Sequence, residues 1–160
     1  MTMNLLDILI AIILALAGIA GYYWGVVRQL LALAGLAAGL AVAGRYGSLA
    51  ADALMSFVDN RAIAGVGGAL IMLALVSGTA SLIASLLQLY VGLIVFGKTD
   101  YGLGAPLGVI HAALLITALA LMIHSNPIEP WDSALRESTL TTFLMQTAGR
   151  ALAPLLGSVL

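Results

Sequence analysis

Four long apolar stretches dominate this sequence. They cover residues 5–23, 26–44, 62–96 and 103–123. A helix needs about 20 apolar residues to cross the hydrocarbon core of a bilayer, and each stretch meets or approaches that length. The sequence therefore predicts an all-α integral membrane protein with four transmembrane helices.

The scarcity of charge supports the same interpretation. Charged residues make up 8% of the chain and hydrophobic residues 62%, whereas a soluble domain carries about 25% charged residues. The chain has too few charges to cover the surface of a water-soluble protein of 160 residues. Its net charge of −1 indicates no basic surface for nucleic acid. The absence of cysteine excludes disulfides and thiolate metal sites.

The first and third stretches each allow two interpretations. As one helix, residues 62–96 would be roughly 52 Å long at 1.5 Å per residue, which exceeds the bilayer core. A long tilted helix is favoured over a break near Gly65, Gly67 and Gly68. In the first stretch, the letters ALAG resemble a signal-peptide cleavage site. A signal peptide begins with basic residues, but no Lys or Arg precedes these four residues, whereas the acidic residue Asp7 does. We therefore expect an uncleaved span.

The residues between these stretches are expected to form connections. Residues 21–25 should form a tight turn, residues 45–61 a longer loop and residues 97–102 a short polar loop. The chain then divides into a four-helix transmembrane domain, residues 1–124, and a C-terminal part, residues 125–160.

The C-terminal part is predicted to contain a linker and an amphipathic helix. Pro127 and Pro130 interrupt any helix directly after the fourth span. Beyond them, apolar residues recur at helical spacing, at Leu140, Phe143, Leu144, Ala148 and Leu152. Polar residues lie largely elsewhere around the helix, at Arg136, Glu137, Thr141 and Arg150. This pattern is typical of a helix that lies on the membrane or on the helix bundle.

The stretch GLIVFGKT, residues 92–99, fits the phosphate-binding pattern G-x-x-x-x-G-K-[ST]. A phosphate-binding loop needs a strand before it, a helix directly after it and an open backbone within it. Here the interior is apolar and bulky, and the Gly- and Pro-rich segment that follows is not expected to start a helix. We therefore expect the end of a membrane helix followed by a surface residue, Lys98, and no nucleotide ligand.

Pairs of glycines four residues apart indicate close packing between helices. The pairs are Gly21 with Gly25, Gly35 with Gly39, and Gly104 with Gly108. The pattern G-x-x-x-G lets the backbones of two membrane helices approach each other closely. The stretch GLGAPLG around the last pair is not a dinucleotide-binding fingerprint, because Leu107 stands where a third glycine is required.

The segment TDYGLGAPLGVIHAALL, residues 99–115, resembles the signature of the colicin V production protein (CvpA) family. In that family a Thr-Asp pair leads into the Gly-rich start of the fourth helix. Other family positions are an Asp early in the first helix, Gly and Arg at the turn into the second, and a Trp after the fourth. The matching residues are Thr99, Asp100, Gly104 and Gly108 in this segment, Asp7, Gly25 and Arg28 before it, and Trp131 after it.

The chain also departs from the family pattern. Trp24, Tyr101 and His111 stand where Arg is usual, and Gln29 stands where Glu is usual. These changes make one face of the membrane domain less basic. The resemblance implies a multi-pass protein of the bacterial inner membrane, linked to colicin V export and envelope homeostasis, with both termini outside.

Polar residues within the apolar stretches form what we call the polar seam. Ser77, Ser81, Ser85 and Gln88 lie on one face of the third expected helix, and His111 lies in the fourth. Hydrogen bonds between helices are the expected role, and a polar path is the alternative. A hydrogen bond from His111 to Ser85 or Gln88 would leave no polar group unsatisfied. A proton-responsive histidine is the alternative.

Asp7 is the only charged residue in the first apolar stretch. A carboxylate one turn inside a helix is stabilised by the helix N-terminus. We expect Asp7 to anchor the structure, paired with Arg45 or His124, which should emerge on the same side of the membrane. A role in ion coupling is the alternative.

Two functions follow from these patterns. The first is a non-enzymatic scaffold or accessory protein that contacts a membrane or periplasmic protein through its glycine faces and polar seam. The second is an oligomeric channel or proton-responsive transport component, which must self-associate because four helices alone rarely enclose a path. Neither function requires a cofactor, a metal or a catalytic residue, and the chain has no G-x-S-x-G motif. The lipid bilayer is its environment in both.

Overall fold

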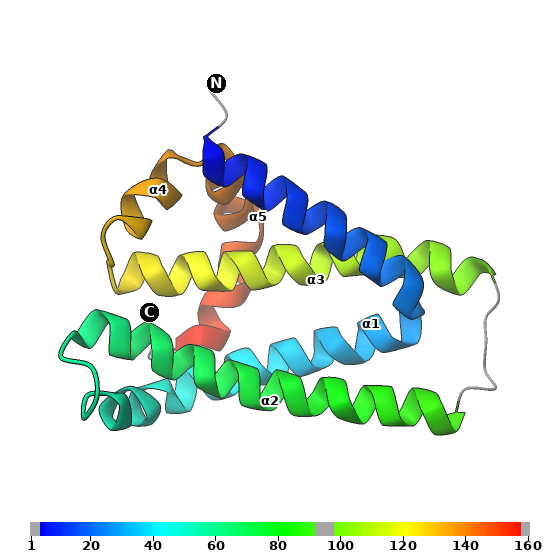
Figure 1. Cartoon of the computed structure of the whole chain (residues 1–160), viewed down its shortest axis with the longest axis horizontal. Coiled ribbons are helices and arrows are strands. Elements are labelled where there is room, and N and C mark those ends of the chain that lie inside the picture. The colour runs from blue at the N-terminus through cyan, green and yellow to red at the C-terminus, as the bar shows by residue number, and fades with distance from the viewer. Residues whose placement is uncertain (1–3, 92–97, 158–160) are drawn as a thin grey trace.

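The computed structural model describes residues 4–91 and 98–157, in which it forms five helices (Figure 1). They are α1 (Leu5–Leu54), α2 (Arg61–Val91), α3 (Lys98–Ser125), α4 (Trp131–Glu137) and α5 (Thr139–Leu156). No strand occurs in these two ranges, in agreement with the predicted all-α class. The side chains of residues 87–91 and 98–101 are outside the description.

Within the described residues, three helices are long and apolar enough to cross a membrane: Leu5–Leu54, Arg61–Leu86 and Gly102–Ser125. By the length and composition of these helices, the prediction of a helical protein with membrane-spanning segments is confirmed. The first helix has 50 residues and would be about 75 Å long if it were straight. It contains two of the four expected spans, residues 5–23 and 26–44.

Helix α1 reverses its direction at Gly25. This residue has φ 74° and ψ 170°, a conformation that glycine adopts readily and residues with a Cβ do not. In Figure 1 the blue part of α1 runs to the bend and the cyan part runs back from it. We call residues 5–24 the N-terminal segment of α1 and residues 26–54 its C-terminal segment.

Glycines allow the N-terminal segment of α1 to lie directly against α3. A Cβ on Gly21 would lie 2.9 Å from the Cα of Gly108 and would overlap the carbonyl oxygen of Gly104. A Cβ on Gly108 would in return lie 3.0 Å from the Cα of Gly21. Two of the glycine pairs noted in the sequence therefore face each other across one helix contact.

The C-terminal segment of α1 packs in the same way against α2. A Cβ on Gly39 would lie 2.9 Å from the Cδ1 atom of Leu73 and 3.2 Å from its carbonyl oxygen. Gly35 lies against the side chain of Ala80. A Cβ on Gly68 of α2 would lie 2.9 Å from the Cα of Ala51. Small residues on both helices thus bring the two backbones together.

The loop expected at residues 45–61 is largely helical, so that expectation is wrong. Helix α1 continues to Leu54, because this part of the chain is rich in Ala and Leu, which favour helix. Helix α2 then begins with a capping residue. The Oδ1 atom of Asn60 accepts hydrogen bonds from the backbone N–H groups of Ala62 at 2.9 Å and Ile63 at 3.2 Å.

The polar loop expected at residues 97–102 is also wrong, because α3 already begins at Lys98. Asp100 lies in its first turn, where the helix dipole favours a negative charge. Residues 92–97, which include the last part of the expected third span, lie outside the described residues. As far as Val91, α2 is helical throughout.

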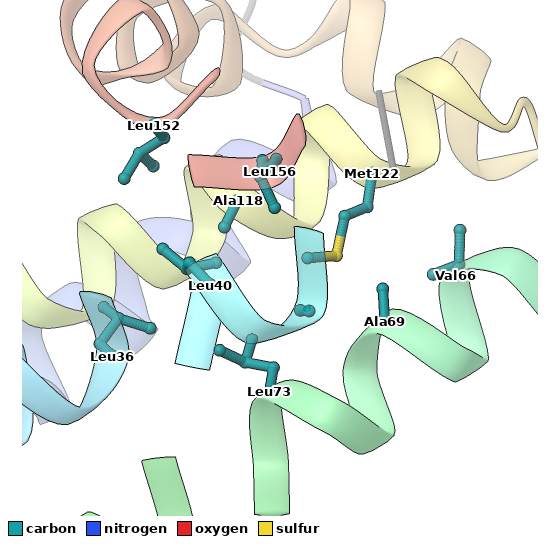
Figure 2. Packing of buried hydrophobic residues seen from close by; sticks show 10 residues of the cluster. Leu36, Leu40, Val66, Ala69, Leu73, Ala118, Met122, Leu152 and Leu156 are labelled. Carbon is teal, nitrogen blue, oxygen red and sulfur yellow. The ribbon is translucent and has the colours of Figure 1, made fainter. Parts of the chain in front are cut away.

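The buried core lies where α5 runs across the other helices (Figure 2). It contains Leu36, Leu40 and Ala43 of α1, Val66, Ala69 and Leu73 of α2, Ala118 and Met122 of α3, and Leu152 and Leu156 of α5. The apolar residue Leu152 is buried as the tail pattern predicted. Thr141, which was expected on the polar side, is also buried, because it packs in the first turn of α5 beside the N-cap residue Ser138.

The glycine contact between α1 and α3 can be tested with a matched pair of substitutions. Gly21→Ala should destabilise the fold by about 1–3 kcal/mol, because the added methyl group overpacks a backbone contact. Gly78→Ala in α2 makes the same chemical change where a Cβ meets nothing within 4 Å. It should be neutral or stabilise by up to about 1 kcal/mol through helix propensity. Thermal unfolding in detergent measures both, and equal effects would contradict the contact.

Candidate functional site

The first turn of α1 carries a buried carboxylate. Asp7 is 1% exposed. Its Oδ1 atom accepts hydrogen bonds from the Oγ of Ser138 at 2.6 Å and from the backbone N–H of Leu140 at 2.9 Å. Its Oδ2 atom accepts one from the backbone N–H of Asn4 at 3.0 Å. We call Asp7, Ser138 and Leu140 the Asp7 anchor, because they join the starts of α1 and α5.

The anchor satisfies a charge that burial would otherwise make costly. The N-termini of both helices present free backbone N–H groups and a partial positive charge. Ser138 is the N-cap residue of α5, and its Oγ accepts a hydrogen bond from the backbone N–H of Thr141 at 3.1 Å while it donates to Asp7. The carboxylate, the serine and the helix end therefore form one continuous hydrogen-bonded unit.

The expected pairing of Asp7 with Arg45 or His124 is wrong. His124, at the end of α3, instead lies with its Nδ1 atom 3.3 Å from the Oδ1 of Asp132 in α4. The Nε of Arg136 donates to the Oδ2 of Asp132 at 3.0 Å. The hydrogen bond from Arg136, and less strongly the one from His124, lower the pKa of Asp132 below its ordinary value of 3.8.

A cavity of about 240 Å³ lies beside the bend of α1 and is lined by residues of α1, α2 and α3. We call it the bend cavity. Its polar and aromatic lining consists of Trp24, Arg28, Gln29, Ser81 and His111. Alanine, glycine and leucine make up the rest of its wall. The cavity therefore brings together residues that are far apart in the sequence.

The polar residues of the bend cavity differ in how they are satisfied. The guanidinium carbon of Arg28 lies 4.3 Å from the ring centre of Trp24, a cation–π contact. Gln29 is 4% exposed. The Nδ1 atom of His111 is buried and has no hydrogen-bond partner. The expected hydrogen bond from His111 to Ser85 is therefore not formed by this atom.

Only part of the polar seam comes together at this cavity. Ser81 and His111 line it. Ser77 donates to the carbonyl oxygen of Leu73 at 2.6 Å, and Ser85 donates to that of Ser81 at 2.9 Å, so both hydroxyls are bonded within α2. The side chain of Gln88 lies outside the described residues. Of the polar seam, Ser81 and His111 therefore line the cavity, whereas the hydroxyl groups of Ser77 and Ser85 are bonded to carbonyl oxygens of α2.

The residues that match the family pattern lie on several elements. Asp7 forms the anchor, Gly25 the bend, and Arg28 part of the cavity, while Gly104 and Gly108 pack against α1. Thr99 and Asp100 lie in the first turn of α3, and their side chains are outside the description. Trp131 begins α4 and is 60% exposed.

The phosphate-binding pattern lies mostly outside the described residues. The expectation that no helix follows it is wrong, because α3 begins at Lys98. A helix rather than a strand precedes it, since α2 extends to Val91, and this arrangement differs from a phosphate-binding loop. Among the described residues, no group of three His, Cys, Asp or Glu side chains is placed to hold a metal ion.

Long apolar helices, a reversal at a glycine and a terminal helix docked across the bundle define a multi-pass helical membrane protein. Comparison with known families supports the resemblance seen in the sequence. Residues 6–149 match the Colicin V production protein family, and the chain belongs to this family. The matched region includes the Asp7 anchor and the bend cavity. No curated protein and no solved structure matches the chain.

Two functional residues were not identified from the sequence. Ser138 carries a recognisable signal, because Ser, Thr, Asp and Asn are the preferred N-cap residues before an apolar helical repeat. Asp132 also carries one, because an acidic residue four positions before Arg136 favours an ion pair on a helix. Neither signal predicts the partner from another helix, which is Asp7 for Ser138 and His124 for Asp132.

Removal of the anchor should release α5. We expect Asp7→Ala to make trypsin cleave after Arg150 faster than in the wild type, because α5 then opens locally more often. Asp59→Ala, in the exposed turn before α2, removes a carboxylate of the same kind and serves as the control. Cleavage is followed by mass spectrometry of the protein in detergent. An unchanged rate in Asp7→Ala would contradict the anchor.

Asp132 gives a pH dependence with a defined direction. Because its pKa is lowered in the folded protein, its contribution to stability is present above the ordinary value and is lost as the pH falls through the lowered pKa. In Arg136→Gln the pKa returns toward its ordinary value, so this contribution shrinks and less stability should be lost at low pH than in the wild type. Thermal unfolding between about pH 2 and 6 measures the difference. Glu137→Gln, an exposed neighbour, should leave the profile unchanged.

Proposed function

We propose that the protein is a non-enzymatic scaffold or accessory protein of the bacterial inner membrane. Its role would be the one that gives the family its name, colicin V production, together with envelope homeostasis. In this proposal each segment of α1 crosses the membrane once, so that the chain crosses four times, and α5 lies at the membrane surface. The partner is another membrane or periplasmic protein.

The reversal at Gly25 supports four crossings. The N-terminal segment of α1 is about 30 Å long at 1.5 Å per residue, which matches the hydrocarbon core of a bilayer. A single crossing by all 50 residues would leave an apolar segment of similar length outside the lipid. Exposed apolar side chains line both segments, for example Leu16 at 59% and Leu30 at 52%, as expected for surfaces that face lipid.

The observation that carries the scaffold proposal is the Asp7 anchor. A buried carboxylate in the first turn of α1 holds the start of α5, so this helix keeps a fixed position on the bundle. Leu152 and Leu156 fix its other end in the core. Thr142, Gln146 and Arg150, four residues apart, remain exposed on its outer side. A firmly held helix with a polar outer face is a suitable platform for a protein partner.

Site-specific photo-crosslinking in native membranes tests this proposal. A photoreactive residue at Gln146 or Arg150 should give a discrete adduct with one partner protein. Placed at Leu75 or Leu82 of α2, which are 60% and 68% exposed, it should give lipid adducts and no such band. Asp7→Ala should abolish the adduct at Gln146, because the platform is no longer held. Absence of an adduct from both α5 positions would refute the platform.

The bend cavity favours the second function, an oligomeric channel or proton-responsive transport component. It places His111 and Ser81 inside the helix bundle, and an ionisable residue within a membrane often marks a transport path. Ion flux into vesicles that contain the purified protein alone separates the two functions. Flux that depends on pH and is lost in His111→Ala would favour transport, whereas a partner adduct without flux would favour the scaffold.

A further inference from the structure

The bend cavity has its cationic side chain close to the bend, and small apolar side chains form part of its wall farther away. Trp24 and Arg28 lie next to Gly25, while Ala17 and Ala32 lie about 10–12 Å from it along their helices. All four of these side chains line the same cavity. Figure 1 shows the bend at one end of the bundle, opposite α4. With one membrane crossing for each segment of α1, as proposed above, this end lies at the level of the lipid headgroups.

Arg28 provides a positive charge at the polar end. Its guanidinium group is held over the ring of Trp24 at 4.3 Å, so its orientation is restricted. Both ion pairs found among the described residues involve Asp132, and neither includes Arg28. A planar guanidinium group matches phosphate oxygens in two-pronged hydrogen bonds. The membrane surface supplies phosphate groups at this level.

The apolar end has the size and chemistry for part of a hydrocarbon chain. Small side chains, among them Ala17, Ala32, Ala84 and Ala112, leave the space open. A volume of about 240 Å³ is below the roughly 300–1,000 Å³ of a site that encloses a whole small molecule. The cavity therefore suits one portion of a ligand whose remainder lies in the surrounding bilayer.

Two further polar groups line the cavity: Gln29 lies beside Arg28, and His111 lies near the depth of Ala17, because Gly108, one turn before it, packs against Ala17. Gln29 is 4% exposed, and the buried Nδ1 atom of His111 has no hydrogen-bond partner. A buried polar atom without a partner is unfavourable. The ester oxygens of a phospholipid lie between its phosphate and its chains, and they accept hydrogen bonds from amide or imidazole N–H groups. Gln29, one residue beyond Arg28, is therefore placed to donate to an ester oxygen of a lipid whose phosphate lies at Arg28.

We propose that the bend cavity binds an anionic phospholipid, with the phosphate at Arg28 and part of one acyl chain against the alanines. The cationic group selects the negative headgroup, and the apolar wall requires the chain. Basic pockets between transmembrane helices bind anionic lipids by the same chemistry. This site is separate from the α5 platform, so the lipid proposal and the partner-binding role of α5 can be tested independently.

Native mass spectrometry of the purified protein in detergent tests the proposal. The probes are phosphatidylglycerol and phosphatidylcholine with identical acyl chains, added in equal amounts. The wild type should retain phosphatidylglycerol about fivefold more than phosphatidylcholine, the preference expected from one basic residue at a membrane surface. Equal retention of the two lipids would overturn the proposal without the need for any variant.

Three variants locate the site. Arg28→Gln should remove the fivefold preference, while the matched control Arg61→Gln, at the exposed start of α2, should keep it. Ala32→Leu should reduce the retention of both lipids, because its larger side chain fills the apolar end. Ala112→Leu fills the same cavity from α3 and replaces Ala32→Leu if that variant does not fold. A preference that persists in Arg28→Gln, or full retention in both leucine variants, would place the lipid elsewhere.

A competition experiment separates the lipid from its headgroup. Glycerol 3-phosphate carries the phosphate but no acyl chain, so it should not displace phosphatidylglycerol at equal concentration. Displacement at equal concentration would show that the cavity is a site for a soluble phosphate compound, and the lipid proposal would then be wrong.

Discussion

The backbone of Gly25 sets the arrangement of every other helix. Its positive φ allows one long apolar helix to reverse within a single residue. The N-terminal segment then packs against α3 and the C-terminal segment against α2. Because the two segments separate as they leave the bend, their far ends must be joined by something else. Helix α5 has that role, since it contacts both α1 and α3.

The lengths of the helices agree with this arrangement. Asp7 and Gly44 both lie about 27–29 Å from Gly25 along their segments. The start of α5 is bonded to Asp7, and its last turn lies against Gly44, where a Cβ would overlap the backbone of Leu155 and Leu156. Helix α5 has 18 residues and is itself about 27 Å long. Because α5 is bonded at Asp7 and packs at Gly44, it bridges the open end of α1.

Sequence patterns predicted the helical class, the apolar spans and the glycines that lie in the helix contacts. These features depend on residues close together in the chain, so their periodicity is visible without a structure. The partner of Asp7 is 131 residues away at Ser138, and no local pattern links two such positions. The error at Lys98 has a different cause. Glycine and proline after it suggested a loop, whereas the chain forms a helix there that includes Pro106.

Polar contacts are important here because two apolar helix surfaces gain little free energy when they leave an equally apolar lipid environment to contact each other. Helices in a bilayer are held by close packing and by hydrogen bonds rather than by exclusion from water. Two contacts between the helices of this protein use one mechanism each. The contact of Gly21 with Gly104 and Gly108 relies on close packing, while the Asp7 anchor relies on hydrogen bonds to a charged group.

The bend cavity and the Asp7 anchor lie near opposite ends of the same helical segment, which runs from Leu5 to Trp24. A helix of this length transmits a change in direction from one end to the other. Any change in the backbone angle at Gly25 would therefore move Asp7 relative to α5, unless the contact of Gly21 with α3 holds the segment in place. The glycine contact thus determines whether a change at the bend cavity can alter the Asp7 anchor.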